Sequence, residues 1–289
     1  MEEKAEKSKV KEVFKNIHAH RFIADVVRRH STNRSDVREI AIDMLDMSEC
    51  RNILDLGCGF GFFTEILKGR VHPRAIVTGV DIIDGYETSF RETCQKAGLE
   101  CRFLSEGASV INKFNDRSFD LILCSYALYF FPEFIPDISR ILTSSGSFIA
   151  ITHDRNNMRE LIAITKEILS RNNVLKEGRL PLEAIISHFS SENGMDLLAS
   201  WFGKVKTADY FNFLVFRPED VHRIIEYFLF KSPLLLTGTD YEFEYVINLL
   251  SIYIQKASFM RDGFTISKND RVFICSSPHN SCHSHGETA

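Results

Sequence analysis

Residues 51–152 alternate between short apolar runs and amphipathic segments, and this alternation restricts the fold more than any other feature of the sequence. The apolar runs predict strands over 51–56, 75–81, 101–104, 119–125 and 147–152, and the intervening segments predict helices over 61–68, 86–97 and 134–142. Short connections between alternating strands and helices indicate a parallel sheet with helices on both faces. Nearly continuous apolar runs are typical of strands buried on both sides.

The segments that flank this region predict additional helices and two late strands. Before it, helices are expected within residues 1–30 and over 35–47. After it, the pattern predicts helices over 157–171, 181–190, 192–202, 218–230 and 240–258, and strands over 204–216 and 271–276. The last residues, 277–289, are polar and are expected to be a disordered tail.

Composition excludes several classes of protein. A net charge of −4 gives no electrostatic footprint for nucleic acid. The seven cysteines are scattered without a CxxC pair, which argues against a zinc site and favours a reducing compartment. The charged N-terminus does not resemble a signal peptide, and no apolar run is long enough for a membrane span. We therefore expect a cytoplasmic protein with neither a membrane nor a nucleic-acid partner.

The sequence ILDLGCGFGFF at residues 53–63 places a Gly-rich turn directly after the first predicted strand. Its glycines form G-x-G-x-G, and Phe62 stands where the dinucleotide fingerprint requires a third glycine. Such a turn allows close approach of a ligand to the backbone, and a following helix N-terminus would suit a carboxylate. Asp55 would accept a hydrogen bond from an ammonium group. The helix N-terminus for a carboxylate and Asp55 for an ammonium group together predict a ligand with an amino-acid moiety.

A series of motifs resembles, in order, those of class I S-adenosylmethionine (SAM)-dependent methyltransferases over roughly residues 50–155. Asp55 to Gly61 matches the first motif, E/D-x-G-x-G-x-G, and VTGVDI places Asp81 at the acidic end of the second strand. LSEGAS and SFDLILCSYALYFF are similar to the segments after the third strand and along the fourth. ISRILTSSGSFIAIT is similar to the helix–turn–strand before and within the fifth, with Gly146 keeping the turn.

The resemblance implies a Rossmann-like, mostly parallel sheet of seven strands with helical cap insertions, and SAM as the cofactor. It implies that Asp81 binds the ribose hydroxyls. The implied cofactor-binding residues are Asp55, Gly57, Cys58, Gly59, Gly61, Asp81, Ile82, Glu106, Gly107 and Ser125. The expected boundaries are N-terminal cap helices at 1–47, the SAM-binding core at 48–155, a helical insertion at 156–203, and last strands with cap helices at 204–276.

The acceptor is expected to be a small molecule with an apolar or aromatic portion. The N/D-P-P-Y/F motif of nucleic-acid amino methyltransferases is replaced by Ser125-Tyr126-Ala127-Leu128, and no Pro-Cys pair is present. His153, just after the fifth strand, is the candidate general base, and Tyr126 is a candidate for shaping the acceptor pocket. The appended helices suggest a cap, with packing on the sheet or pairing in a homodimer as the alternatives.

Two other hypotheses follow from the same residues. A SAM-binding regulatory protein without transfer activity would keep the same motifs, and an NAD-dependent oxidoreductase is opposed by Phe62. In the tail, Cys282, His283 and His285 match no zinc-module spacing, so no metal site is expected.

Overall fold

The chain folds into two compact units, each assembled from separate segments of the sequence. A computed structural model describes residues 10–171, 178–236 and 243–279. Unit 1 consists of the described parts of Met1–Val37, Thr152–Glu192 and Asp209–Arg271. Unit 2 consists of the described parts of Arg38–Ile151, Asn193–Ala208 and Val272–Ala289.

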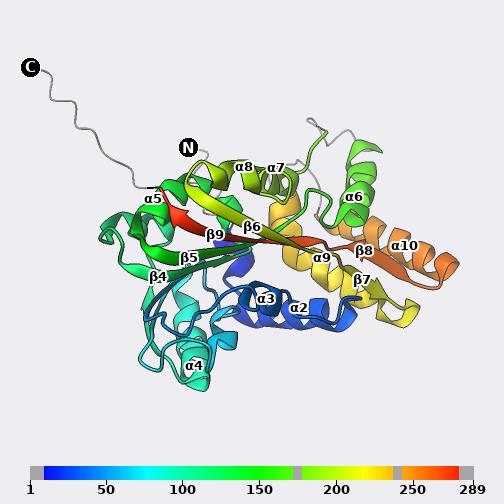
Figure 1. The fold of residues 1–289 in the computed structure, drawn as a ribbon. Coiled ribbons are helices and arrows are strands. Elements are labelled where there is room, and N and C mark those ends of the chain that lie inside the picture. The colour runs from blue at the N-terminus through cyan, green and yellow to red at the C-terminus, as the bar shows by residue number, and fades with distance from the viewer. Residues whose placement is uncertain (1–9, 172–177, 237–242, 280–289) are drawn as a thin grey trace, which may run out of the picture. The chain divides into compact units, whose positions relative to one another are not determined.

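A seven-stranded sheet with the order β3-β2-β1-β4-β5-β9-β6 confirms the predicted α/β fold (Figure 1). Its strands are β1 (Asn52–Leu56), β2 (Ile76–Val80), β3 (Glu100–Leu104), β4 (Phe119–Ser125), β5 (Leu142–His153), β6 (Phe202–Tyr210) and β9 (Asp270–Pro278). The pairings of β1 with β2 and β4, of β2 with β3, and of β4 with β5 are all parallel. Four consecutive residues are buried in both β1 and β2, as expected for strands covered on both faces.

The strand register brings three strand ends to one edge of the sheet. Asp55 on β1 pairs with Gly79 on β2 and with Leu123 on β4. The turns that leave β1, β2 and β4 therefore start side by side. In open α/β sheets this carboxyl edge is where ligands bind.

The helices of unit 2 cover both faces of the sheet. In Figure 1, α5 and α8 lie on one face, and α3 and α4 lie on the other. Their bounds are α3 (Val37–Ile42), α4 (Glu87–Ala97), α5 (Ile135–Ile141) and α8 (Gly194–Ala199). Short 3₁₀ helices complete the connections at Thr64–Leu67, Asp84–Tyr86, Ala108–Lys113, Leu128–Phe130 and Pro132–Phe134. The helix predicted over 35–47 is shorter than expected.

The α-helix predicted over residues 61–68 is wrong. Turns lead into a single 3₁₀ helix at Thr64–Leu67. Gly61 has a φ of +85°, which a right-handed helix does not allow. The Thr64 hydroxyl donates to Asp55 Oδ2 at 2.7 Å and ties the segment to β1. The expected α-helix N-terminus for a ligand carboxylate is therefore not formed here.

Unit 1 is mainly helical and has a small sheet of its own. Its helices are α2 (Ile17–His30), α6 (Arg159–Arg171), α7 (Pro181–His188), α9 (Val221–Leu236) and α10 (Phe243–Arg261), with a 3₁₀ turn at Pro218–Asp220. The antiparallel strands β7 (Phe213–Phe216) and β8 (Phe264–Ser267) form the second sheet. The single strand predicted over 204–216 is wrong, since β6 and β7 belong to different sheets. β8 was not predicted.

Pro233 lies inside α9 without breaking it. Proline has no N–H, so the carbonyl of Leu229 loses its usual helical donor. The Ser232 hydroxyl donates to that carbonyl at 2.8 Å and replaces the missing bond. Serine next to the proline thus lets α9 continue to Leu236.

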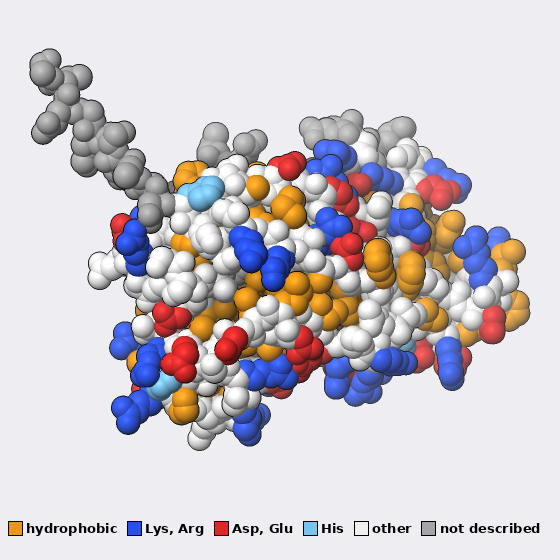
Figure 2. All heavy atoms as spheres, viewed as in Figure 1, with side chains coloured by type: hydrophobic (Ala, Val, Ile, Leu, Met, Phe, Trp, Pro, Cys, Tyr) orange, Lys and Arg blue, Asp and Glu red, His pale blue; other side chains and the backbone are white. Residues whose placement is uncertain are grey.

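Large exposed hydrophobic side chains are unevenly distributed. Met44 and Met195 are the examples within the described part of unit 2, whereas eleven lie in unit 1. On α10, Ile252 is 63% exposed and Phe259 is 86% exposed. Figure 2 shows hydrophobic side chains at the surface over α10. No helix in the described ranges has the length and apolar character needed to cross a membrane.

Candidate cofactor site

The Gly-rich turn after β1 requires glycine for two separate reasons. Gly57, Gly59 and Gly61 have φ values of +68°, +49° and +85°, which favour residues without a Cβ. A Cβ on Gly57 would lie 2.4 Å from the Cβ of Ala127, so the turn also passes too close to the segment after β4 for a side chain. The Gly57 and Cys58 N–H groups donate to the Val80 carbonyl at 2.8 and 3.1 Å. The turn is thereby fixed against the end of β2.

Asp81 connects the turns that follow β1, β2 and β3. Its Oδ2 accepts from the Gly59 N–H at 2.9 Å and its Oδ1 from the Ile83 N–H at 3.0 Å. Its backbone carbonyl accepts from Gly107 N–H at 3.1 Å. Asp81 therefore brings the predicted residues Gly59 and Gly107 together, the first through its carboxylate and the second through its backbone carbonyl.

Asp55 lies beneath this turn and is 2% exposed. Burial raises its pKa to about 7, opposed by the hydrogen bond from Thr64 and reinforced by the charge of Asp81. Burial likewise raises the pKa of Asp81. Two carboxylates that lack full solvation favour a positively charged ligand nearby, because opposite charge stabilises their ionised forms.

The last residue of β4, Ser125, and the residue after it, Tyr126, are the other two residues predicted at this edge. The Ser125 hydroxyl oxygen is buried and has no hydrogen-bond partner among the described residues. Tyr126 adopts a φ of +56°, which costs a non-glycine residue on the order of 1 kcal/mol. Its N–H donates to the Ile151 carbonyl at 2.8 Å, and its ring centroid lies 6.2 Å from that of Phe62. A buried unsatisfied hydroxyl beside a strained residue is typical of a ligand site.

The remaining predicted cofactor residues differ in their surroundings. Gly107 has a φ of +73°, and a Cβ there would lie 3.5 Å from the side chain of Ile82, so these two residues adjoin. Cys58 is buried, which raises its thiol pKa well above the ordinary value. Glu106 is exposed and forms an ion pair of 2.7 Å with Lys113. Its assignment to the cofactor stays a prediction.

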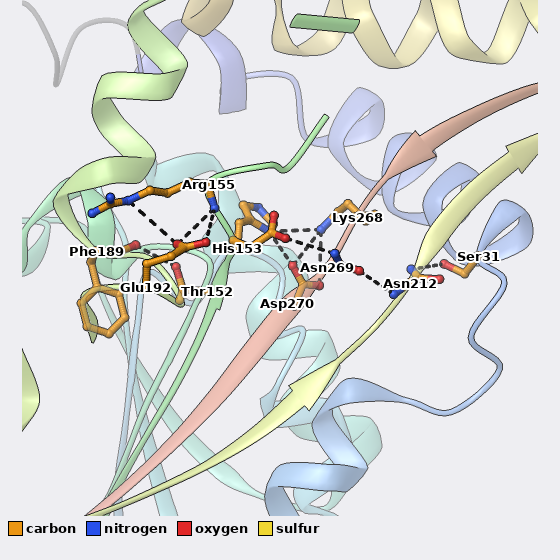
Figure 3. A network of polar contacts seen from close by, with 11 residues as sticks. Ser31, Thr152, His153, Arg155, Phe189, Glu192, Asn212, Lys268, Asn269 and Asp270 are labelled. Atoms are coloured by element: carbon orange, nitrogen blue, oxygen red, sulfur yellow. Dashed lines mark hydrogen bonds and ion pairs between the residues drawn. The ribbon is translucent and has the colours of Figure 1, made fainter. Parts of the chain in front are cut away.

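His153, the predicted general base, is 6% exposed and belongs to a buried polar network of unit 1 (Figure 3). Its Nδ1–H donates to Asp270 Oδ1 at 2.6 Å. Lys268 Nζ lies 3.2 Å from both atoms of that bond. Burial, followed by the charge of Lys268, lowers the pKa of His153 to about 4. The imidazole is therefore neutral near pH 7, and its catalytic role stays a prediction.

Amide side chains hold the turn between β8 and β9 that carries Lys268 and Asp270. Asn269 Nδ2 donates to Asp154 Oδ2 at 3.1 Å, and Asn269 Oδ1 accepts from the Asn212 N–H at 3.0 Å. Asn212 Nδ2 in turn donates to Ser31 Oγ at 3.0 Å. All three segments of unit 1 thus fix the position of the two charged groups (Figure 3).

The described residues contain no group of three or more His, Cys, Asp or Glu side chains arranged for a metal. Cys282, His283 and His285 lie outside the described residues. Sequence analysis did not identify Thr64, Lys231, Lys268 or Asp270 as site residues. For Lys268 and Asp270, the one available signal was the polar run Lys268-Asn269-Asp270 just before the predicted strand over 271–276.

Residues 54–150 match the protein family described as "Methyltransferase domain". The chain is 30% identical over 114 residues to aklanonic acid methyltransferase DauC from Streptomyces sp. strain C5, a match that covers 38% of this chain and 52% of that protein. It is 28% identical over 116 residues to the uncharacterized methyltransferase YcgJ from Bacillus subtilis, covering 38% of this chain and 45% of YcgJ. The chain therefore spans about half the length of these curated relatives.

The solved structure of YcgJ superimposes with a TM-score of 0.54 at 15% sequence identity. The superposition covers 84% of this chain and 98% of that structure. At this identity the likeness shows the fold.

Proposed function

Residues 54–150 are a class I methyltransferase domain, and from this premise we propose that the protein is a SAM-dependent enzyme that methylates a small molecule. The observation that carries the proposal is the turn around Asp81. Its carboxylate lies beside a positive-φ Gly turn, over the buried Asp55, and the sheet register brings the unsatisfied Ser125 hydroxyl to the same edge. This set suits a ligand with hydroxyl groups and positive charge.

The residues present fit SAM. When bound, SAM would supply a sulfonium methyl group that is transferred to the acceptor atom by in-line displacement, with the neutral thioether as the leaving group. Asp81 would hold the ribose hydroxyls, and the Gly turn from Gly57 to Gly61 would let the backbone approach the amino-acid part. Asp55 and Asp81 would offset the ligand's positive charge, and Ser125 would gain a hydrogen-bond partner. These residues bind and orient, which is the main requirement for an in-line displacement.

The acceptor is the part of the proposal that depends on unit 1. A small acceptor agrees with DauC, a relative that acts, by its name, on aklanonic acid. It also agrees with the net charge of −4, which gives nucleic acid no attraction. We propose that the helices of unit 1 supply the acceptor-binding residues, as a cap would. All six cysteines in the described ranges are free thiols, which supports a location in the reducing cytoplasm.

Calorimetric titration of the purified chain with SAM tests the proposal. We expect binding to the wild type, and binding at least about tenfold weaker for Asp81→Asn, because a carboxylate acceptor is lost. Asp84→Asn changes an exposed carboxylate three residues away and serves as the matched control. No SAM binding, or equal affinity in Asp81→Asn, would contradict the proposal.

Two further measurements separate the alternatives. Titration with NAD should give no binding, because Phe62 occupies the position of the third glycine. Transfer of a labelled methyl group to a panel of small acids and phenols distinguishes an enzyme from a regulatory protein that only binds SAM. Light scattering on the same sample tests the homodimer expectation.

A further inference from the structure

Lys231 is a charged residue that is not part of the proposed cofactor site. It lies on α9, and its side chain is half-buried. Its Nζ lies 5.6 Å from the ring centroid of Phe14 and 5.5 Å from that of Phe230. Burial and the charge of Lys268 lower its pKa, and no carboxylate among the described residues contributes to that shift. A buried ammonium group without a counter-ion is costly, and contacts with aromatic rings offset only part of that cost.

A second lysine adds to the positive charge in the same part of unit 1. Lys268 is 7% exposed, and its Nζ lies 3.2 Å from Asp270 Oδ1. Burial, and then repulsion from Lys268, lowers the pKa of Lys231 to about 8. Asp270 is thus one carboxylate against two ammonium groups, and it also accepts the hydrogen bond from His153.

The two histidines of this region do not add positive charge at neutral pH. Burial and then the charge of Lys231 lower the pKa of His20 to about 3, and the pKa of His153 is lowered to about 4. The His20 ring stacks on Phe230 with centroids 5.5 Å apart. The cluster formed by Lys231, Lys268 and Asp270 therefore carries a net charge of about +1 at pH 7.

An apolar groove adjoins the cluster through Phe230. The groove has a volume of about 390 Å³ and lies along α2 and α9. Its apolar lining includes Val13, Phe22, Ile23, Leu229, Phe230 and Pro233. Glu12 and Glu226 also line it and disfavour an anion inside the groove itself. An apolar body suits the groove, and a negative charge suits Lys231.

We propose that Lys231, supported by Lys268, binds the carboxylate of an aromatic or otherwise apolar acid, and that this acid is the methyl acceptor, an assignment that rests on the proposed function. A carboxylate matches the single surplus charge and is ionised at neutral pH without help from the protein. A phosphate would bring nearly two charges and three strong acceptors, for which a cluster with a single surplus charge is a poor match.

Titration with 2-naphthoate and with its neutral analogue 2-naphthamide tests the site. We expect the wild type to bind 2-naphthoate with a dissociation constant of about 1 mM or below, as the ligand's size allows, and to bind the amide at least about tenfold more weakly. Lys231→Met should bind 2-naphthoate at least about tenfold more weakly, while Lys231→Arg keeps the charge and should stay within about threefold of the wild type. Lys256→Met removes an exposed lysine of α10 in the same unit and is the matched control.

Equal binding of the acid and the amide, or of the wild type and Lys231→Met, would overturn the inference. The comparison of acid with amide uses only the wild type, so it decides the question even if Lys231→Met does not fold. SAM titration of the same samples separates the two proposals. Binding of SAM without 2-naphthoate overturns this inference alone, and binding of 2-naphthoate without SAM overturns the proposed function.

Discussion

The two units bury charge of opposite sign. Unit 2 buries the carboxylates of Asp55 and Asp81 beside a glycine turn, and burial raises both pKa values. Unit 1 buries ammonium groups, with Asp270 as the carboxylate between Lys268 and His153. A carboxylate with a raised pKa favours a cationic ligand, and an ammonium group with a lowered pKa favours an anionic one. This contrast is what we expect if, as proposed, unit 2 binds SAM and unit 1 binds an anionic acceptor.

The surfaces of the units differ as well. Eleven of the thirteen large hydrophobic residues exposed in the described ranges belong to unit 1. The sheet of unit 2 buries its apolar residues on both faces, whereas the helices of unit 1 keep apolar side chains such as Phe259 at the surface. We therefore expect that more of the apolar residues of unit 1 serve binding, and fewer serve core packing, than those of unit 2.

The largest effect is expected from Asp270→Asn, which removes the carboxylate that Lys268 and His153 share. Leaving buried ammonium groups uncompensated should lower the free energy of unfolding by about 3–5 kcal/mol. Asp209→Asn breaks an exposed 2.6 Å ion pair with Arg271 and should cost less than about 1 kcal/mol. Urea denaturation of both variants measures the difference. A small loss in Asp270→Asn would show that the positive charge of unit 1 is compensated elsewhere.

A somewhat smaller effect is expected in unit 2 from Gly57→Ala. The new Cβ would lie 2.4 Å from Ala127 Cβ at a φ of +68°. Backbone strain and overpacking together should lower stability by about 3 kcal/mol. Gly69→Ala has nearly the same φ, +69°, with no atom within 4 Å, and should cost only about 1 kcal/mol. If chemical denaturation finds equal losses, the close approach to Ala127 contributes nothing, and the double change Gly57→Ala/Ala127→Gly should bring no recovery.

The smallest expected effect is the pH dependence of stability, to which the two units contribute with opposite signs. His20 and His153 have folded pKa values of about 3 and about 4, below the ordinary 6.5, so unfolding takes up protons as the pH falls below 6.5 and stability decreases. Asp55 acts in the opposite direction, because its folded pKa of about 7 exceeds the ordinary 3.8 and acidification below 7 favours the folded state. For these three groups alone, we expect a net loss of about 1 kcal/mol from pH 6.5 to 5.

Denaturation of two variants at both pH values checks the sign for each unit. Asp55→Asn removes the opposing contribution of unit 2, so its loss on acidification should exceed that of the wild type. His153→Asn removes part of the contribution of unit 1, so its loss should be smaller. The reverse order would contradict the assignment of charge to the units. Other titrating groups are shared by all three proteins and cancel in the comparison.

The central sheet could be predicted because its strands are nearly continuous apolar runs with turn residues between them. β4 was predicted with its observed bounds, Phe119–Ser125. The region of residues 61–68 could not be predicted, because the hydrogen bond between Thr64 and Asp55 and the positive φ of Gly61 override the helical pattern. β8 has four residues, too few for periodicity to distinguish from a loop.

The predicted cofactor residues could be located in the sequence because they lie in a glycine motif and at the ends of predicted strands, although their binding role stays a prediction. Asp81 and Gly59 are 22 residues apart in sequence and meet through adjacent strand ends. The charged cluster of unit 1 could not be predicted, since Asp270 is 117 residues from His153. The sequence did not mark Lys231 as a binding residue either, because a lysine in an apolar helix usually extends its charged end into water.

The segmented composition of the units has a consequence for synthesis on the ribosome. β1 to β5 all lie within residues 52–153, so these five adjacent strands can pair as soon as that stretch has emerged. Ser31, directly after α2, pairs with Asn212, which is 181 residues further on. At ordinary elongation rates of about 5–20 residues per second, α2 waits roughly 10 to 40 s for its partners. Although α2 is translated early, it is therefore among the last elements to be packed, and its apolar face is open to chaperones in the meantime.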